Sequence, residues 1–206
     1  EQQHSFPTRR SSELTYEYEG TVPTGATALQ QEATYKYGAS VKVAENAVAA
    51  GYTFSGWDKE NFTMPANDVV IKGSFTANQN TAYKVEHYLE NLDGEGYTLA
   101  DTENKAGTTD TEVTAEAKTF EGFTFDSKVE GTVETGIVAG DGSLVLKLYY
   151  TRNSYKVTYK YEGTVPTGAT ALPQEATYKY GASVKVAESA VAAGYTFSGW
   201  DKEDCT

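Results

Sequence analysis

The chain has very few of the side chains on which most enzyme and metal chemistry depends. Its 206 residues include one cysteine, two histidines and one methionine, which argues against a disulfide framework and a zinc site built on Cys and His. Cations are also scarce, with 17 Lys and Arg against 29 Asp and Glu. The net charge of −12 argues against nucleic acid as a partner, because phosphate contacts need clustered cations. No apolar run approaches the roughly 20 residues of a membrane helix, so we expect no membrane insertion.

Tyrosine and glycine are abundant, at 16 and 19 residues, and this composition favours β structure with frequent turns. Apolar patterning predicts short strands at residues 14–19, 40–44, 51–57 and 69–75, and then at 83–89, 97–102, 111–118, 123–126 and 144–150. Residues 45–50 fit either one helical turn or a loop. We therefore expect a mainly β fold (β-rich α+β) made of tandem small β-sheet modules.

An internal repeat is the strongest signal in the sequence. Residues 14–63 recur as residues 157–206, at an offset of 143 and with identity at 44 of 50 positions. The six differences are Leu14/Val157, Glu17/Lys160, Gln30/Pro173, Asn46/Ser189, Asn61/Asp204 and Phe62/Cys205. Such near-identity over a long period is typical of a tandem array, in which every copy does the same job.

The repeat divides the chain into modules. We assign residues 14–78 to module A, residues 81–152 to a different module B, and residues 155–206 to a second, C-terminally truncated module A. Within module B, residues 83–89 and 144–150 are expected to pair or pack in one core. The joints at residues 77–80 and 151–154 are short and polar, which limits bending and favours an elongated array.

Residues 1–13 differ from everything that follows. Residues 4–12 are basic and read like the translation of a sequencing adapter, so we interpret residues 1–13 as a non-native scar and exclude them from the fold. The alternative is a basic N-terminal linker.

Two motifs carry a family resemblance. Module A contains GYTFSGW at residues 51–57, followed by FTMPANDV at residues 62–69. With these it closely resembles the SHIRT repeat domain of Gram-positive surface proteins, and the first motif also resembles the Listeria–Bacteroides repeat. Module B, with YKVEHY at residues 83–88 and LKLYYTRN at residues 146–153, is similar to mucin-binding-protein (MucBP-like) repeats. The resemblance implies small β-rich folds, some of them β-grasp, in the stalk of an extracellular, wall-anchored adhesin.

Candidate sites are few, and we predict no catalytic residue, no metal ligand and no cofactor. His87 lies at an inward position of its strand, which favours a packed histidine over a catalyst. Cys205 replaces Phe62 of the first copy and has no neighbouring histidine in the sequence. Trp57 and Trp200 are candidate ligand contacts, because aromatic rings stack on sugars. The alternative is that each tryptophan closes the core of a small domain.

Two functions compete. The first is a structural stalk, in which neighbouring repeats of the chain are the main partners. The second is a binding module, in which module B docks mucin, other host glycans or a host protein. The repeat identity favours the stalk, and neither reading makes the chain an enzyme.

Overall fold

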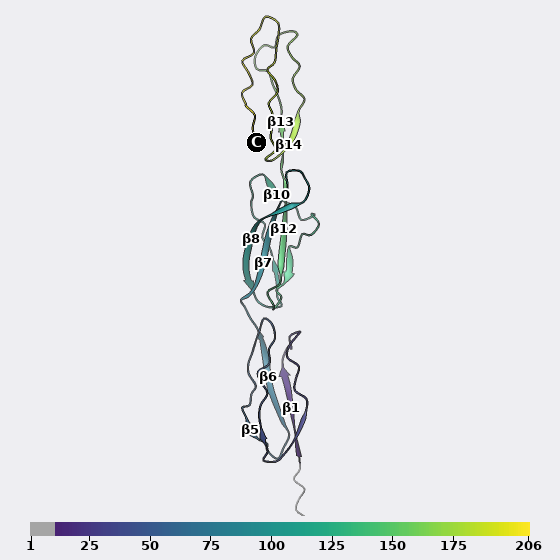
Figure 1. Ribbon diagram of the computed structural model, residues 1–206, viewed down its shortest axis with the longest axis vertical. Helices are drawn as coiled ribbons and strands as arrows, with labels where there is room; N and C mark the ends of the chain where they lie inside the picture. The colour runs from purple at the N-terminus through teal and green to yellow at the C-terminus, as the bar shows by residue number, and fades with distance from the viewer. Residues whose placement is uncertain (1–10) are drawn as a thin grey trace, which may run out of the picture. The chain divides into compact units, whose positions relative to one another are not determined.

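The computed structural model describes residues 11–206, which form strands β1 to β14 (Figure 1). This range contains no helix, and so no helix that is long and apolar enough to cross a membrane. The mainly β fold class is confirmed, and residues 45–50 are a loop. The helix that a β-grasp fold carries across its sheet has no counterpart in this range. Residues 1–10 of the expected scar lie outside the described residues.

The chain divides into two compact units. The first comprises Glu1–Tyr83, Asn104–Val113 and Gly136–Leu144, and the second comprises Lys84–Glu103, Thr114–Thr135 and Val145–Thr206. The division therefore passes through module B, which contributes residues to both units. Each unit contains one complete joint between an A module and module B.

The first sheet has four strands in the order β2-β1-β6-β4, namely β1 (Ser11–Glu19), β2 (Ala33–Lys36), β4 (Tyr52–Phe54) and β6 (Val69–Ala77). The central strands β1 and β6 are parallel, and both outer strands are antiparallel to their neighbours. Strands β3 (Ser40–Val41) and β5 (Phe62–Thr63) form a separate pair. The core cluster that they enclose consists of Leu14, Val41, Met64, Val69 and Ile71.

Strand β1 begins earlier than the sequence indicated. Ser11, Ser12 and Glu13 pair with Lys36, Tyr35 and Thr34 of β2. Ser12 is only 2% exposed. The exclusion of these three residues from the fold is therefore corrected, because the register of β2 extends over them.

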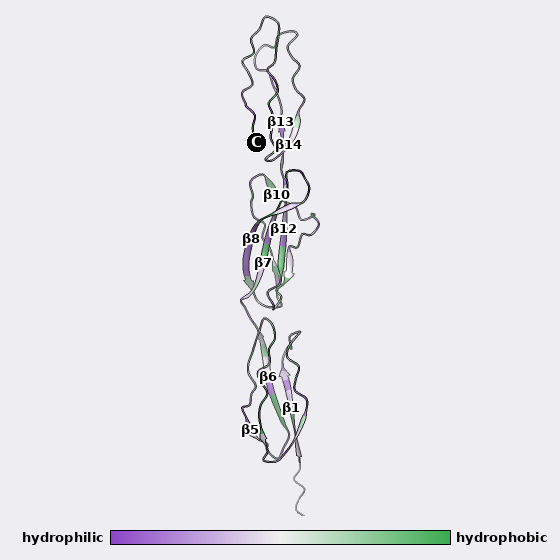
Figure 2. Cartoon of the chain, viewed as in Figure 1, coloured by the Kyte–Doolittle hydropathy of each residue, from purple (hydrophilic) through white to green (hydrophobic). Residues whose placement is uncertain are grey.

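The second sheet has the order β10-β12-β7-β8, namely β7 (Thr81–Glu90), β8 (Tyr97–Gly107), β10 (Phe123–Phe125) and β12 (Val145–Arg152). Strands β7 and β12 are parallel and adjacent, as expected for residues 83–89 and 144–150. Strands β9 (Glu112–Thr114) and β11 (Thr135–Ile137) form a separate pair. Figure 2 shows hydrophobic stretches on β7 and β12, whereas β8 at the edge is mainly hydrophilic.

Modules A and B share one topology although their sequences differ. In both four-stranded sheets the first and last strands lie parallel at the centre. The second strand flanks the first, the fourth flanks the last, and the third pairs with the fifth. The turn after the second strand also matches: Gly38 donates its N–H to Met64 O, and Asp110 donates to Val138 O, both at 2.9 Å. Asp110 has a φ of 61°, in the left-handed region that glycine occupies at position 38.

The second A copy keeps the first pairing of the fold. Strand β13 (Ser154–Val157) pairs with β14 (Ala176–Lys179) in the register of β1 and β2, shifted by 143 residues. It repeats residues 14–63 only, so it contains no equivalent of β6. Its one buried hydrophobic residue is Ala190, among the described residues of this copy. Val157 and Val184 are half-buried, whereas the equivalent Leu14 and Val41 are buried.

Candidate functional site

Trp57 lies in an aromatic cluster of module A. Its ring stacks on Tyr18, with centroids 5.7 Å apart and planes inclined by 13°. Tyr16 and Phe54 meet the same ring edge-on, each at 4.9 Å. The indole N–H donates to the carbonyl of Glu45 at 3.1 Å. One face and the polar group of Trp57 are thus already engaged, which fits the core alternative.

Strand β6 completes this cluster in the first copy. Phe75 lies 5.0 Å from Phe54 and 5.1 Å from Tyr18, measured between ring centroids. The ring of Phe54 also packs directly over Gly73, where a Cβ would collide with it. The last strand of the module therefore places the ring of Phe75 and the Cα of Gly73, which has no side chain, against the residues around Trp57.

Trp200 has the same near neighbours in the second copy. Its ring stacks on Tyr161 at 5.8 Å, and Tyr159 and Phe197 lie 4.9 Å away. The indole N–H donates to Glu188 O at 3.2 Å. The local fold around each tryptophan is therefore the same, down to the hydrogen bond.

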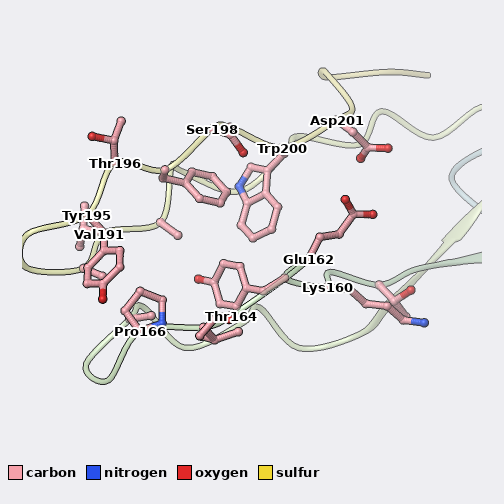
Figure 3. Close-up of a pocket in the computed structure, with 18 residues that line it drawn as sticks. Lys160, Glu162, Thr164, Pro166, Val191, Tyr195, Thr196, Ser198, Trp200 and Asp201 are labelled. Carbon is pink, nitrogen blue, oxygen red and sulfur yellow. The ribbon is translucent and has the colours of Figure 1, made fainter.

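A pocket of about 690 Å³ opens beside Trp200. Figure 3 shows the Trp200 indole pointing into it, near the Glu162 carboxylate, with Val191 and Pro166 toward the opposite end. In the first copy, Phe75 of β6 packs on Tyr18 and Phe54, the equivalents of the pocket residues Tyr161 and Phe197. The pocket combines aromatic surface with carboxylates, which is the chemistry of a carbohydrate contact, and it lies where β6 packs in the first copy.

His87 is packed in the core of module B, as predicted. Its side chain is fully buried, with Nδ1 2.9 Å from Tyr150 Oη and Nε2 2.9 Å from Glu103 Oε1. The Tyr150 hydroxyl oxygen also accepts the backbone N–H of Lys118 at 2.9 Å, and burial raises the pKa of Tyr150. The histidine joins β7 to its neighbours β8 and β12, which is a structural role.

Cys205 is exposed and lies in a backbone bridge with Val184. Phe62 and Val41 make the equivalent pairing between β5 and β3 in the first copy. The cysteine therefore occupies a strand position of the repeat.

The joints between modules are interaction sites that had no signal in the sequence. In the first unit, the hydroxyl of Tyr52 donates to Asp110 Oδ2 at 2.5 Å, which raises the pKa of Tyr52. In the second unit, Glu90 accepts a hydrogen bond from the backbone N–H of Arg152 at 2.7 Å and another from the ammonium group of Lys179. The bond from Lys179 holds the pKa of Glu90 below its usual range. The joints are therefore bonded contacts and not free linkers.

A family model decides the identity of the repeated module. The model of the Listeria-Bacteroides repeat domain matches residues 13–81 and 155–206, which together exceed half of the chain. The chain belongs to the Listeria-Bacteroides repeat family. This match confirms one of the two resemblances stated for module A. Module B lies outside the matched residues, and its MucBP-like resemblance stays a prediction.

A solved structure is also similar to this repeat protein. It is described as Streptococcal High Identity Repeats in Tandem (SHIRT) domains 3-4 from a cell surface protein, with 16% sequence identity. The similarity covers 68% of this chain and 98% of that one, at a TM-score of 0.24. A score this low does not show a common overall fold.

Proposed function

We propose that this Listeria-Bacteroides repeat chain is a stalk segment of a Gram-positive surface adhesin, which projects an adhesive domain from the cell wall. The observation that carries the proposal is the repetition, because two copies identical at 44 of 50 positions both match one family. Identical copies in series extend a chain without adding a new activity. An extracellular, wall-anchored location is part of this proposal, because the resemblance of module A to repeats of Gram-positive surface proteins implies that setting.

Charge supports the same role. The net charge of −12 keeps neighbouring chains apart and soluble, as an extended surface protein requires. The partners in this account are the neighbouring repeats of the same chain, and no enzymatic activity or cofactor is included.

Small-angle scattering of the whole chain tests the stalk. A compact protein of this length would have a radius of gyration of about 17 Å, and an unfolded one of about 49 Å. A stalk predicts a value well above the first, together with the scattering cross-section of a thin rod. A radius close to the compact value contradicts the proposal.

A second candidate is a binding module for mucin, other host glycans or a host protein. The pocket beside Trp200 favours it, since aromatic rings and the carboxylates of Glu162 and Asp201 line the same space. A glycan array with the full chain tests this function, with Trp200→Ala and Trp57→Ala as matched variants. Binding that only Trp200→Ala abolishes would support a site in this pocket. Binding by module B alone would instead support the MucBP-like reading.

A further inference from the structure

The first joint is organised around Asn78. Its backbone N–H donates to Gly51 O at 2.8 Å, and its side-chain Oδ1 accepts the hydroxyl of Thr53 at 2.7 Å. Its backbone carbonyl accepts the N–H of Thr109 at 3.0 Å. The first two partners belong to module A and the third to module B, and all four residues lie in the first unit.

The second joint repeats this arrangement around Asn153. Its N–H donates to Gly122 O at 2.8 Å, and its Oδ1 accepts the hydroxyl of Thr124 at 2.7 Å. Its carbonyl accepts the N–H of Tyr180 at 2.8 Å. Here the first two partners belong to module B and the third to the second A copy, and all four lie in the second unit.

The matching residues occupy equivalent places in the shared topology. Gly51 and Thr53 stand at the start of β4, and Gly122 and Thr124 stand at the start of β10. Each asparagine directly follows the last strand of its module, β6 or β12. Thr109 and Tyr180 each lie in the turn after the second strand of the next module, β8 or β14. The same three hydrogen bonds thus recur in modules of different sequence.

We infer that this asparagine, together with the Gly-aromatic-Thr run at the start of the fourth strand, is a common docking site through which each module receives the next. Its partner is the turn that follows the second strand of an adjoining module. The asparagine side chain is tied to its own module, so its carbonyl is held in position for the incoming N–H.

The glycines allow the close approach that docking requires. Gly51 and Gly122 both have a φ of 76°, in the left-handed region. A Cβ on Gly51 would collide with Gly140 and Thr109 of module B. A Cβ on Gly122 would collide with the ring of Tyr180. Any other residue would therefore separate the modules at these points.

Side chains around the docking site differ between the joints and fit one partner each. At the first joint, Thr109 Oγ1 donates to Gly51 O at 2.8 Å and lies 2.6 Å from Thr81 Oγ1. At the second, Arg152 donates to Tyr180 O at 2.8 Å and lies 4.8 Å from the centroid of the Phe123 ring. The backbone contacts are thus common to both joints, while these side chains favour the alternation of A with B.

The test measures the freedom of the first joint in the full chain. Spin labels are placed at Lys42 and Ile137, which are exposed positions in modules A and B of the first unit, in a Cys205→Ser background. Asn78→Ala is compared with Asn80→Ala, a matched change at an exposed residue of the same joint. We expect the label–label distance distribution to broaden at least twofold in Asn78→Ala and to stay as in the parent in Asn80→Ala.

Two further measurements keep the result decisive. Thr53→Val removes only the hydroxyl that orients Asn78, and it should broaden the distribution less than Asn78→Ala does. Hydrogen exchange at the Thr109 amide should accelerate at least tenfold in Asn78→Ala and in Thr53→Val, while exchange in the module A core stays unchanged. If Asn78→Ala unfolds module A, the distance distribution and the Thr109 exchange rate of Thr53→Val decide the test. If the width of the label–label distance distribution and the exchange rate at Thr109 both stay unchanged, the inference is overturned. That outcome leaves the stalk function standing, because a stalk can also have flexible joints.

Discussion

The imidazole of His87 and the hydroxyl of Tyr150 are hydrogen-bonded at 2.9 Å in the core of module B. The bond connects β7 to β12, the parallel central strands of the sheet. Both side chains are almost fully buried, and each has one further polar partner: Glu103 for His87 and the Lys118 N–H for Tyr150.

His87→Ala should therefore cost stability and nothing else. Removing the ring leaves a cavity and takes away one of the two hydrogen-bond partners of the Tyr150 hydroxyl, and we expect a loss of about 1–3 kcal/mol in the free energy of unfolding. Urea unfolding of the full chain measures this loss, with Tyr150→Phe as the milder change. Any binding by the chain should be unaffected. Hydrolysis of a sugar or peptide that is abolished in His87→Ala would contradict the structural role.

The ion pair at the second joint should make stability depend on acid. The pKa of Glu90 is lowered by Lys179 in the folded state. The stabilisation that the Glu90 carboxylate provides is therefore fully present above pH 4.5, the usual pKa of a glutamate. It is lost as the pH falls from 4.5 through the lowered pKa. Glu90→Gln should thus be less stable than the parent at pH 7, and the two should converge at low pH. Thermal unfolding at pH 7, 4.5 and 3 measures the difference in unfolding temperature between the two proteins. A difference that stays constant with pH would refute the prediction.

Module B should fold without its neighbours. Its central strands β7 and β12 pair directly, and the core residues Val85, Leu146 and Leu148 come from these strands. A polypeptide of residues 82–152 is expected to unfold in one cooperative transition. Circular dichroism during heating is the measurement, and a featureless melt would show that the module boundary is misplaced.

The second A copy should be less protected than the first. It has no equivalent of Val69 and Ile71, each worth roughly 1.5–3 kcal/mol when fully buried. Amides of residues 184–187 should exchange much faster than those of residues 41–44. Appending residues 64–77 after Thr206, with Cys205→Phe, should restore protection. Equal protection of the two segments in the unmodified chain would show that β6 is dispensable.

Strands with clear alternation could be predicted from the sequence, because alternation reports which face is buried. This holds for residues 14–19 and for the pairing of residues 83–89 with 144–150. Strands β2, β5 and β11 were missed, since they have only four, two and three residues. Runs this short show no clear alternation, and they are strands because a neighbouring strand pairs with them. The topology common to modules A and B could not be predicted either, because two modules can have the same strand order without having similar sequences.

The candidate site was predicted only in part. GYTFSGW placed Trp57 among aromatic residues, and Phe54 of this motif does contact it. Tyr52 of the motif contacts Phe75 instead, and Tyr18, which stacks on Trp57, lies outside the motif. Asn78 and Asn153 carried no separate signal, because each stood in a joint that was interpreted as a polar connection. Only the recurrence of Gly-aromatic-Thr before each joint pointed to them, and its meaning depends on contacts made across the joint.

A stalk requires that modules in series add length. Scattering from the present chain is compared with that from a chain carrying one further copy of residues 14–156, which is one period of 143 residues. The account predicts that the longest dimension grows by a full period of two modules while the rod cross-section stays constant. A chain that gains mass and cross-section without this gain in length would contradict it.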